Sequence, residues 1–251
     1  MSLFPQPILP LYSVPVLLFD GFPDLLPLPS SSAPSLPSNW RRIGPCHPAG
    51  FADPAARVSL MDFFQQQRRS RSRVLLYLGD RGSFDVWQVR TLLRGLQDPL
   101  TQVLVLGAAS GRLEASPETL FLSSEAVSPF YLLDARLVTA VISFCDGLLA
   151  QAALHAQVPL LCVPSRRNRG QVHRLVAARA AIQFPEGFWT ESTVRDCMRQ
   201  LMALEGVTVD ESVWEGSRKE MATTIAESVE NREWRGTGAM RFDDLGWLGA
   251  W

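Results

Sequence analysis

The sequence predicts an α/β domain, a Rossmann-like parallel sheet with helices on both faces, preceded by a proline-rich segment. Three observations predict it. From residue 74 onward, short and continuously apolar runs alternate with segments of helical spacing. Two of the apolar runs end directly at a glycine, as buried parallel strands often do. Twelve of the eighteen prolines, in contrast, lie in residues 1–54.

The expected elements follow from this alternation. Continuous apolar runs predict strands at residues 74–78, 102–106, 119–122, 139–143, 158–163 and 181–184. Apolar residues at helical spacing predict helices at residues 84–96, 132–136, 148–156, 169–179, 190–204 and 211–230. A short buried strand is also expected near residues 14–19.

Changes in composition divide the chain into three parts. Residues 1–54 are a proline-rich stub and linker, residues 55–235 form the domain, and residues 236–251 are a tail containing tryptophan. Residues 26–38 are expected to form an extended linker. The apolar start has no basic region and is interrupted by prolines, so neither a signal peptide nor a transmembrane segment is expected. The sequence therefore predicts a soluble, cytoplasmic protein.

Composition also excludes several classes of function. A net charge of -1 and a pI near 6.3 argue against a nucleic-acid partner. The four cysteines form no CxxC pair, which argues against zinc ribbons and disulfide scaffolds and favours a reducing compartment. With only three histidines, no metal site is expected.

In an open parallel sheet, ligands bind beyond the carboxyl ends of the strands. The loops to consider are therefore residues 79–83, 107–112, 144–149 and 165–170. Gly79, Asp80 and Arg81 follow the first strand of the domain, where the two charged residues form either part of a site or a local ion pair. Neither GxGxxG nor a P-loop sequence is present.

Residues 128–184 resemble the C-terminal, donor-binding half of GT-B glycosyltransferases of the UDP-glycosyltransferase superfamily. Aligned without gaps, Phe144 falls on the family's histidine, and Cys145 also matches the family's pattern. Val158-Pro159 falls on its Val-Pro, and Pro164 on its second proline. The likeness extends over roughly residues 39–230, but it is most specific within residues 139–185.

The resemblance implies hexosyl transfer from a UDP-sugar to a small-molecule or lipid acceptor. The UDP-sugar would be a co-substrate, and no other cofactor is implied. The family's catalytic base belongs to its N-terminal half, so no catalytic residue is assigned in this chain. A partner or a homo-oligomer would have to supply the acceptor-binding half.

The polar positions of the family's donor motif are changed. Phe144 replaces the histidine that helps to hold the diphosphate, and Asp146 replaces a glycine. The resemblance implies that Gly147, Leu148 and Leu149, around the expected helix start, also contribute to donor binding through backbone amides. At about 4 Å and a dielectric near 20, a carboxylate would repel a phosphate by on the order of 4 kcal/mol. Ala150 and Ala152 fall on or beside the positions of the family's hydroxyl and ribose-binding carboxylate.

Asn168 and Arg169 stand where the family has the Asp/Glu-Gln pair that binds the sugar. Three hypotheses stay open: an active transferase, a catalytically degenerate partner or scaffold, and a pocket for another small anion. The arginines Arg166, Arg167 and Arg169 at the mouth of the crevice would anchor that anion. Cys145 is either a nucleophile paired with a histidine or, as most buried cysteines are, structural.

Overall fold

A computed structural model describes the main body of the chain and two short strands before it. The described residues are 16–19, 40–43, 50–66, 72–79, 84–107, 116–165, 168–187 and 189–204, together with Lys219 and Thr223. The linker expected at 26–38 and the tail at 236–251 lie outside these residues. So does the helix expected at 211–230, apart from Lys219 and Thr223, which are helical.

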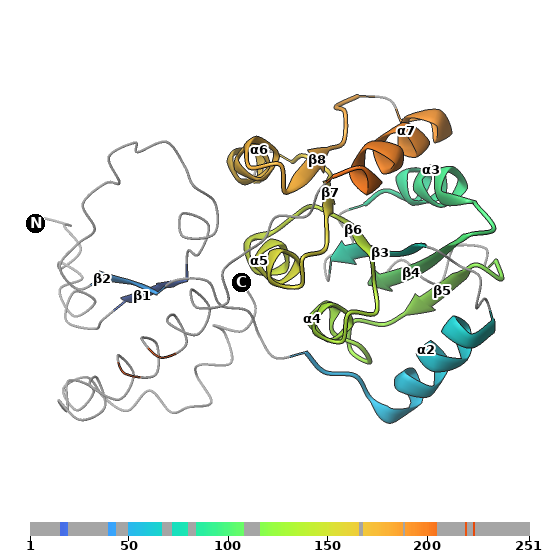
Figure 1. Ribbon diagram of the computed structural model, residues 1–251, viewed down its shortest axis with the longest axis horizontal. Coiled ribbons are helices and arrows are strands. Elements are labelled where there is room, and N and C mark those ends of the chain that lie inside the picture. Colours follow the sequence, from blue (N-terminus) through green and yellow to red (C-terminus); the bar gives the residue numbers. More distant parts are fainter. Residues whose placement is uncertain are drawn as a thin grey trace, which may run out of the picture.

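The centre of the domain is a six-stranded, all-parallel sheet, which confirms the predicted fold class (Figure 1). Its order is β5-β4-β3-β6-β7-β8. The strands are β3 (Ser72–Gly79), β4 (Thr101–Gly107), β5 (Thr119–Leu122), β6 (Ala140–Ser143), β7 (Leu160–Cys162) and β8 (Ala181–Gln183). Counted along the chain from β3, this is the 3-2-1-4-5-6 order of doubly wound folds.

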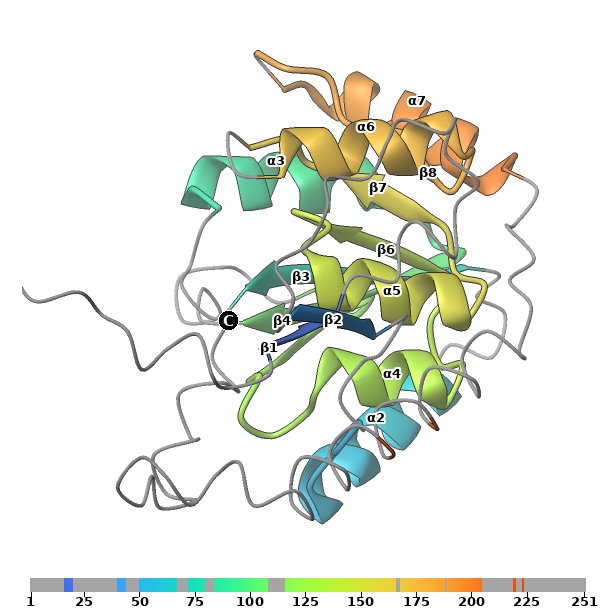
Figure 2. The same ribbon diagram turned by 90° about the vertical axis from the view of Figure 1, so that its left-hand side faces the viewer.

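Helices cover both faces of the sheet, with α2 and α4 on one side and α3 and α7 on the other (Figure 2). The helices are α2 (Pro54–Gln66), α3 (Val86–Leu96), α4 (Pro129–Asp134), α5 (Gly147–His155), α6 (Arg169–Ala177) and α7 (Glu191–Met202). The alternation of side chains along each strand divides the core into two layers. Leu75 of β3, for example, packs with α2, α4 and α5, whereas Leu76 packs with α3 and α7.

Helix α2 was not expected from the sequence. Asp53 caps it, because its Oδ1 accepts a hydrogen bond of 2.6 Å from the Ala56 amide, and Pro54 occupies the first helical position. Its buried residues are Ala56, Leu60, Phe63 and Phe64. This i, i+4, i+7, i+8 spacing gives the helix one apolar face against the sheet.

The prediction for α4 was wrong in position. The helix begins at Pro129 and ends at Asp134 rather than covering residues 132–136. The Ser128 Oγ accepts a hydrogen bond of 3.1 Å from the Phe130 amide, and a proline follows directly, so the chain enters the helix here. The other expected helices and strands within the domain's described residues are present with shifts of a few residues at their ends.

Before the domain, β1 (Val16–Phe19) and β2 (Trp40–Ile43) pair as a two-stranded parallel sheet. The strand expected near residues 14–19 is thus present, whereas β2 was not expected. None of the helices in the described part of the chain has the length and hydropathy needed to cross a membrane. The domain boundaries at 54/55 and 235/236 stay predictions.

The contact between α3 and α7 generates a stability prediction. A β-carbon on Gly95 would lie 2.5 Å from Val194 Cβ, whereas one on Gly170 of α6 would meet no atom within 4 Å. We expect Gly95→Ala to lower the free energy of unfolding by about 1–3 kcal/mol through overpacking. Gly170→Ala, which gains the same helix propensity, should leave it equal or slightly higher. Urea denaturation measures both, and equal stability of the two variants would contradict the close packing of α3 on α7.

Candidate functional site

The candidate site lies at the carboxyl ends of β3 and β6, the two neighbouring strands from which the sheet is built outward in opposite directions. From β3 the chain builds the sheet outward through β4 and β5, then crosses to β6 on the other side. The carboxyl ends of β3 and β6 therefore diverge into loops that leave in opposite directions, which is where open α/β sheets bind ligands. Gly79 ends β3 here with φ of 74°, while Asp80 and Arg81 lie outside the described residues.

Gly79 pairs with Gly107 at the end of β4, and the two backbones approach closely. Gly107 has φ of 133°, and a β-carbon there would lie 3.0 Å from the Gly79 carbonyl oxygen. Gly79 is favoured at its position by its positive φ, and Gly107 both by its positive φ and by the close approach of the neighbouring strand.

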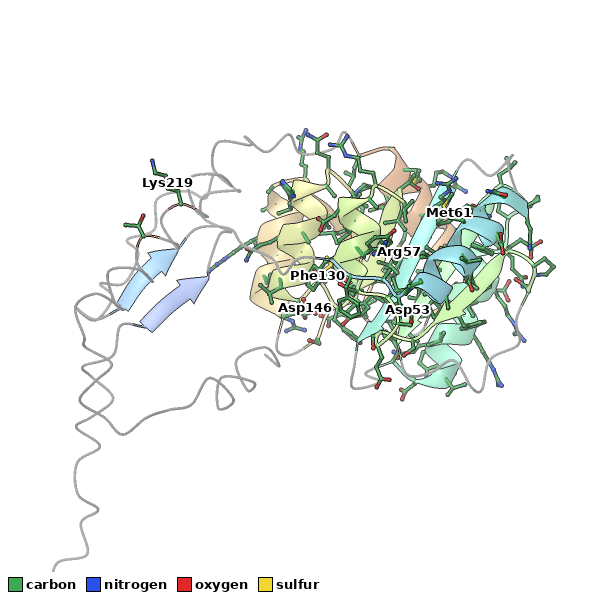
Figure 3. The ribbon with its side chains drawn as sticks, turned by 90° about the horizontal axis from the view of Figure 1, so that it is seen from below. Asp53, Arg57, Met61, Phe130, Asp146 and Lys219 are labelled. Carbon is green, nitrogen blue, oxygen red and sulfur yellow. A yellow bond between two sulfur atoms is a disulfide. The ribbon has the colours of Figure 1, made fainter. Side chains whose placement is uncertain are left out.

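Asp146 caps the helix that begins at this edge, and Figure 3 labels it at the start of α5. Its Oδ1 accepts a hydrogen bond of 3.1 Å from the Leu149 amide. The first turn of a helix carries unpaired amides and a partial positive charge, which is why phosphates bind there. In this chain a carboxylate of the protein itself holds one of those amides. The Leu149 side chain is buried, whereas Gly147 and Leu148 are half-buried.

The exposure of Asp146 changes the electrostatic expectation. The residue is exposed, so water screens its charge, and the repulsion lies between the values for a protein surface and for bulk water. At about 4 Å, two unit charges in water repel by about 1 kcal/mol instead of about 4 kcal/mol. Asp146 therefore weakens the site for a diphosphate less than the sequence alone suggested.

Phe144 belongs to a cluster of aromatic rings at the same edge. Its ring centroid lies 4.3 Å from that of Phe84, and Phe84 lies 6.5 Å from Trp189. Trp189 in turn lies 4.5 Å from Phe184 and 5.8 Å from Trp87. Phe144 thus extends the core packed under α3 and α7, which accounts for an apolar ring at a position where the resembled family has a histidine.

The Asn168 amide is engaged within the protein. Its Oδ1 accepts hydrogen bonds from the Ser165 amide at 2.6 Å and the Ser165 hydroxyl at 2.9 Å. Its Nδ2 donates to the Val163 carbonyl at 3.2 Å and to the Phe144 carbonyl. With 8% of its surface exposed, Asn168 joins the loop after β7 to the loop after β6. The arrangement is that of a structural clamp, and a sugar would have to compete with these bonds.

Arg169 is exposed, and its guanidinium donates to the Glu186 carboxylate at 2.6 Å. Side chains as open as these, at 70% and 53%, form ion pairs that contribute little to stability. The pair nevertheless balances the charge that was expected to bind an anion. Arg166 and Arg167, the other two anchors of that hypothesis, lie outside the described residues.

Cys145 and Cys162 form a disulfide, so these two cysteines are not the free thiols that the sequence led us to expect. Their Cα atoms are 5.4 Å apart because β6 and β7 are neighbouring parallel strands whose carboxyl ends meet at one edge. A bridged Cys145 has no thiol to act as a nucleophile. Cys145 is fully buried, as expected of a structural cysteine.

Two contributors to this edge were missed in the sequence. Gln171 on α6 donates from Nε2 to the Cys145 carbonyl at 2.6 Å, and Trp189 supports the aromatic cluster from the segment before α7. Nothing in the residue pattern around either one distinguishes it before the fold is known. Among the described residues, no three side chains of His, Cys, Asp or Glu converge as metal ligands would.

The engagement of Asn168 predicts a large difference between two neighbouring substitutions. Asn168→Ala removes the partners of two carbonyls and of Ser165, and should lower the free energy of unfolding by about 2 kcal/mol. Arg169→Ala removes only an exposed ion pair and should change it by less than about 0.5 kcal/mol. Chemical denaturation of both variants measures the difference. Similar values would show that Asn168 does not hold the two loops together.

We compared the sequence and the structure with those of known proteins. No family model matches the sequence, and no curated protein matches it. Solved structures do match. The rhamnosyltransferase SpnG complexed with spinosyn aglycone is 16% identical over 80% of this chain and 53% of its own, with a TM-score of 0.51. Medicago truncatula UGT71G1 complexed with UDP-glucose is 17% identical over 71% and 43%, with a TM-score of 0.52.

A variant of Os79 from O. sativa in complex with UDP is 20% identical over 65% of this chain and 41% of its own, with a TM-score of 0.51. The chain thus spans about half the length of the structures it matches. At this identity the likeness concerns the fold, and it agrees with the resemblance found in the sequence. The chain has the Rossmann-like α/β fold of GT-B UDP-glycosyltransferases.

Proposed function

We propose that this domain binds a UDP-sugar at the carboxyl edge of its sheet and takes part in hexosyl transfer to a small-molecule or lipid acceptor. The observation that carries the proposal is the start of α5 at the reversal point between β3 and β6. Helix amides and the helix dipole at such a point bind phosphates. The fold shared with solved glycosyltransferases, two of them in complex with UDP or UDP-glucose, supports the same assignment.

The chain's own residues would bind and orient the donor. Gly79 leaves the end of β3 open, since a β-carbon there would meet no atom within 4 Å. Gly147 and Leu148, both half-buried, form the first turn of α5. Asp80 and Arg81 stay predicted contributors. The base that removes the acceptor proton would come from the acceptor-binding half, which a partner would supply. The cytoplasmic location stays a prediction.

The carboxylate of Asp146 gives a direct test of where the diphosphate binds. Asp146→Asn keeps a good helix cap and removes one negative charge. If the diphosphate lies at the start of α5, removing a repulsion of about 1 kcal/mol should tighten UDP binding roughly fivefold. Isothermal titration with UDP and UDP-glucose measures this.

Asp98 offers a matched control. Its Oδ1 accepts a hydrogen bond of 2.8 Å from the Leu100 amide in the turn before β4, at the opposite edge of the sheet. Asp98→Asn removes the same charge from a similar hydrogen bond and should leave UDP affinity unchanged. No heat with either ligand at millimolar concentration, in the wild type and in both variants, would exclude the proposed function for this chain.

A second candidate, a catalytically degenerate domain that serves as a partner or scaffold, is favoured by one specific observation. Each described polar side chain that was expected to face the donor already has a partner in the protein. Asp146 accepts from the Leu149 amide, Asn168 bonds to two loops, and Arg169 pairs with Glu186. Under this alternative the carboxyl edge keeps its framework and binds no nucleotide sugar.

Restoring the family's residues distinguishes the two candidates. Since Asn168 is structural, the useful double variant is Phe144→His with Asp146→Gly. An active donor site should bind UDP at least tenfold more tightly in this variant, because an imidazole replaces the ring and a like charge is removed. Titration of the double variant beside the wild type is the measurement. A folded double variant that still shows no binding would favour the scaffold.

A further inference from the structure

The disulfide ties the loop that joins β6 to α5 to the end of β7. Cys145 is the second residue after β6, and Cys162 is the last residue of β7. Both are fully buried, and strand pairing places Ser143 beside Cys162. The bridge spans 17 positions of sequence and closes a loop that contains the whole of α5.

The same loop is held from α6 by two amide side chains. Asn168 donates from Nδ2 to the Phe144 carbonyl, and Gln171 donates from Nε2 to the Cys145 carbonyl at 2.6 Å. The Ser143 Oγ accepts a hydrogen bond of 2.9 Å from the Cys145 amide. Covalent and polar restraints therefore converge on two successive residues, immediately before the Asp146 cap.

The backbone of Cys145 is left-handed, with φ of 50°. Among the described residues, the other non-glycine residues with positive φ are Arg136, Gln157 and Arg179. Each of these three follows the end of a helix by two residues, where left-handed backbone is common. Cys145 instead lies between a strand and a helix start. Because a β-carbon disfavours this conformation, the loop keeps its shape through the bonds that hold it.

We propose that the Cys145–Cys162 bridge is a reducible clamp on residues 144–147. Oxidised, it holds the loop so that Asp146 stays on the first turn of α5. Reduced, the loop loses its covalent restraint, Cys145 relaxes from the left-handed region, and Asp146 leaves the Leu149 amide, one of those that a ligand phosphate would bind. The effect on a ligand rests on the proposed function, whereas the change in the loop does not.

The redox step requires a dithiol reductant. One of its thiolates attacks a cysteine sulfur, the S–S bond breaks, and the other cysteine leaves as a thiolate. The second thiol of the reagent then closes its own disulfide and releases the first cysteine. Two electrons and two protons pass from the dithiol to the protein, which ends with two thiols. Because both cysteines are fully buried, the reagent reaches them only when the loop opens.

Hydrogen exchange of the full chain tests the clamp without any ligand. With the bridge intact and then with dithiothreitol present, amide exchange is followed by mass spectrometry. We expect exchange across residues 145–150 to become at least tenfold faster after reduction, with β3 and β4 unchanged. Unchanged exchange in the loop would overturn the proposal. A rise throughout the chain would also overturn it, because the bridge would then stabilise the whole fold.

Serine variants provide the matched comparison. The double variant Cys145→Ser with Cys162→Ser should reproduce the exchange pattern of the reduced chain. Cys197→Ser should reproduce the oxidised pattern, since Cys197 is a free cysteine buried in the opposite core layer. Burial, with a smaller contribution from Asp196, raises the pKa of the Cys197 thiol and keeps it protonated. If the double variant does not fold, the reduced wild type still gives the decisive measurement.

Titration with UDP in both redox states completes the test. We expect at least tenfold tighter binding to the reduced chain. Faster loop exchange without UDP binding in either state would support the clamp and exclude the nucleotide-sugar function. Equal UDP affinity in both states would overturn the control of the site by the bridge.

Discussion

Burial of β3 on both faces is the constraint on which the rest of the structure depends. Val74, Leu75 and Leu76 are fully inaccessible to solvent, because helices cover both sides of the strand. A strand in this position has no polar face, so its sequence is continuously apolar until Gly79 ends it. The same central position makes its carboxyl end the reversal point of the sheet. The apolar run and the candidate site are therefore two consequences of one arrangement.

This constraint explains how much of the fold could be predicted. The strands of the sheet are short and apolar, and the sequence pattern identified each of them. Helix α2 was not predicted although Asp53-Pro54 is a good start signal, because proline is typical both of linkers and of the first position of a helix. The pairing of Cys145 with Cys162 also had a signal. Cys145 follows one expected strand and Cys162 lies near the end of another, but only the strand order, which the residue pattern does not give, makes the two strands neighbours.

The candidate site was less predictable, because a residue's identity does not reveal its partner. Asn168 was expected to face a sugar, yet its amide binds Ser165 and two carbonyls of neighbouring loops. Phe144 was interpreted as a lost imidazole, yet its ring packs on Phe84. Alignment identifies which contacts with a ligand have changed. The hydrogen bonds that replace them form between segments far apart in sequence and follow no local pattern.

These replacements share one physical logic. A helix start at the edge of a sheet has unpaired amides, and a sharp loop has carbonyls that need donors, whether or not a ligand is present. A ligand phosphate can satisfy the amides; otherwise the protein must do so itself. Here Asp146 holds the Leu149 amide, while Asn168 and Gln171 hold the loop carbonyls. One first-turn amide and two loop carbonyls thus have partners without a ligand. A diphosphate at this edge has to compete with the Asp146 carboxylate for the helix start, and the mobility of this one loop therefore helps to separate a donor site from a scaffold.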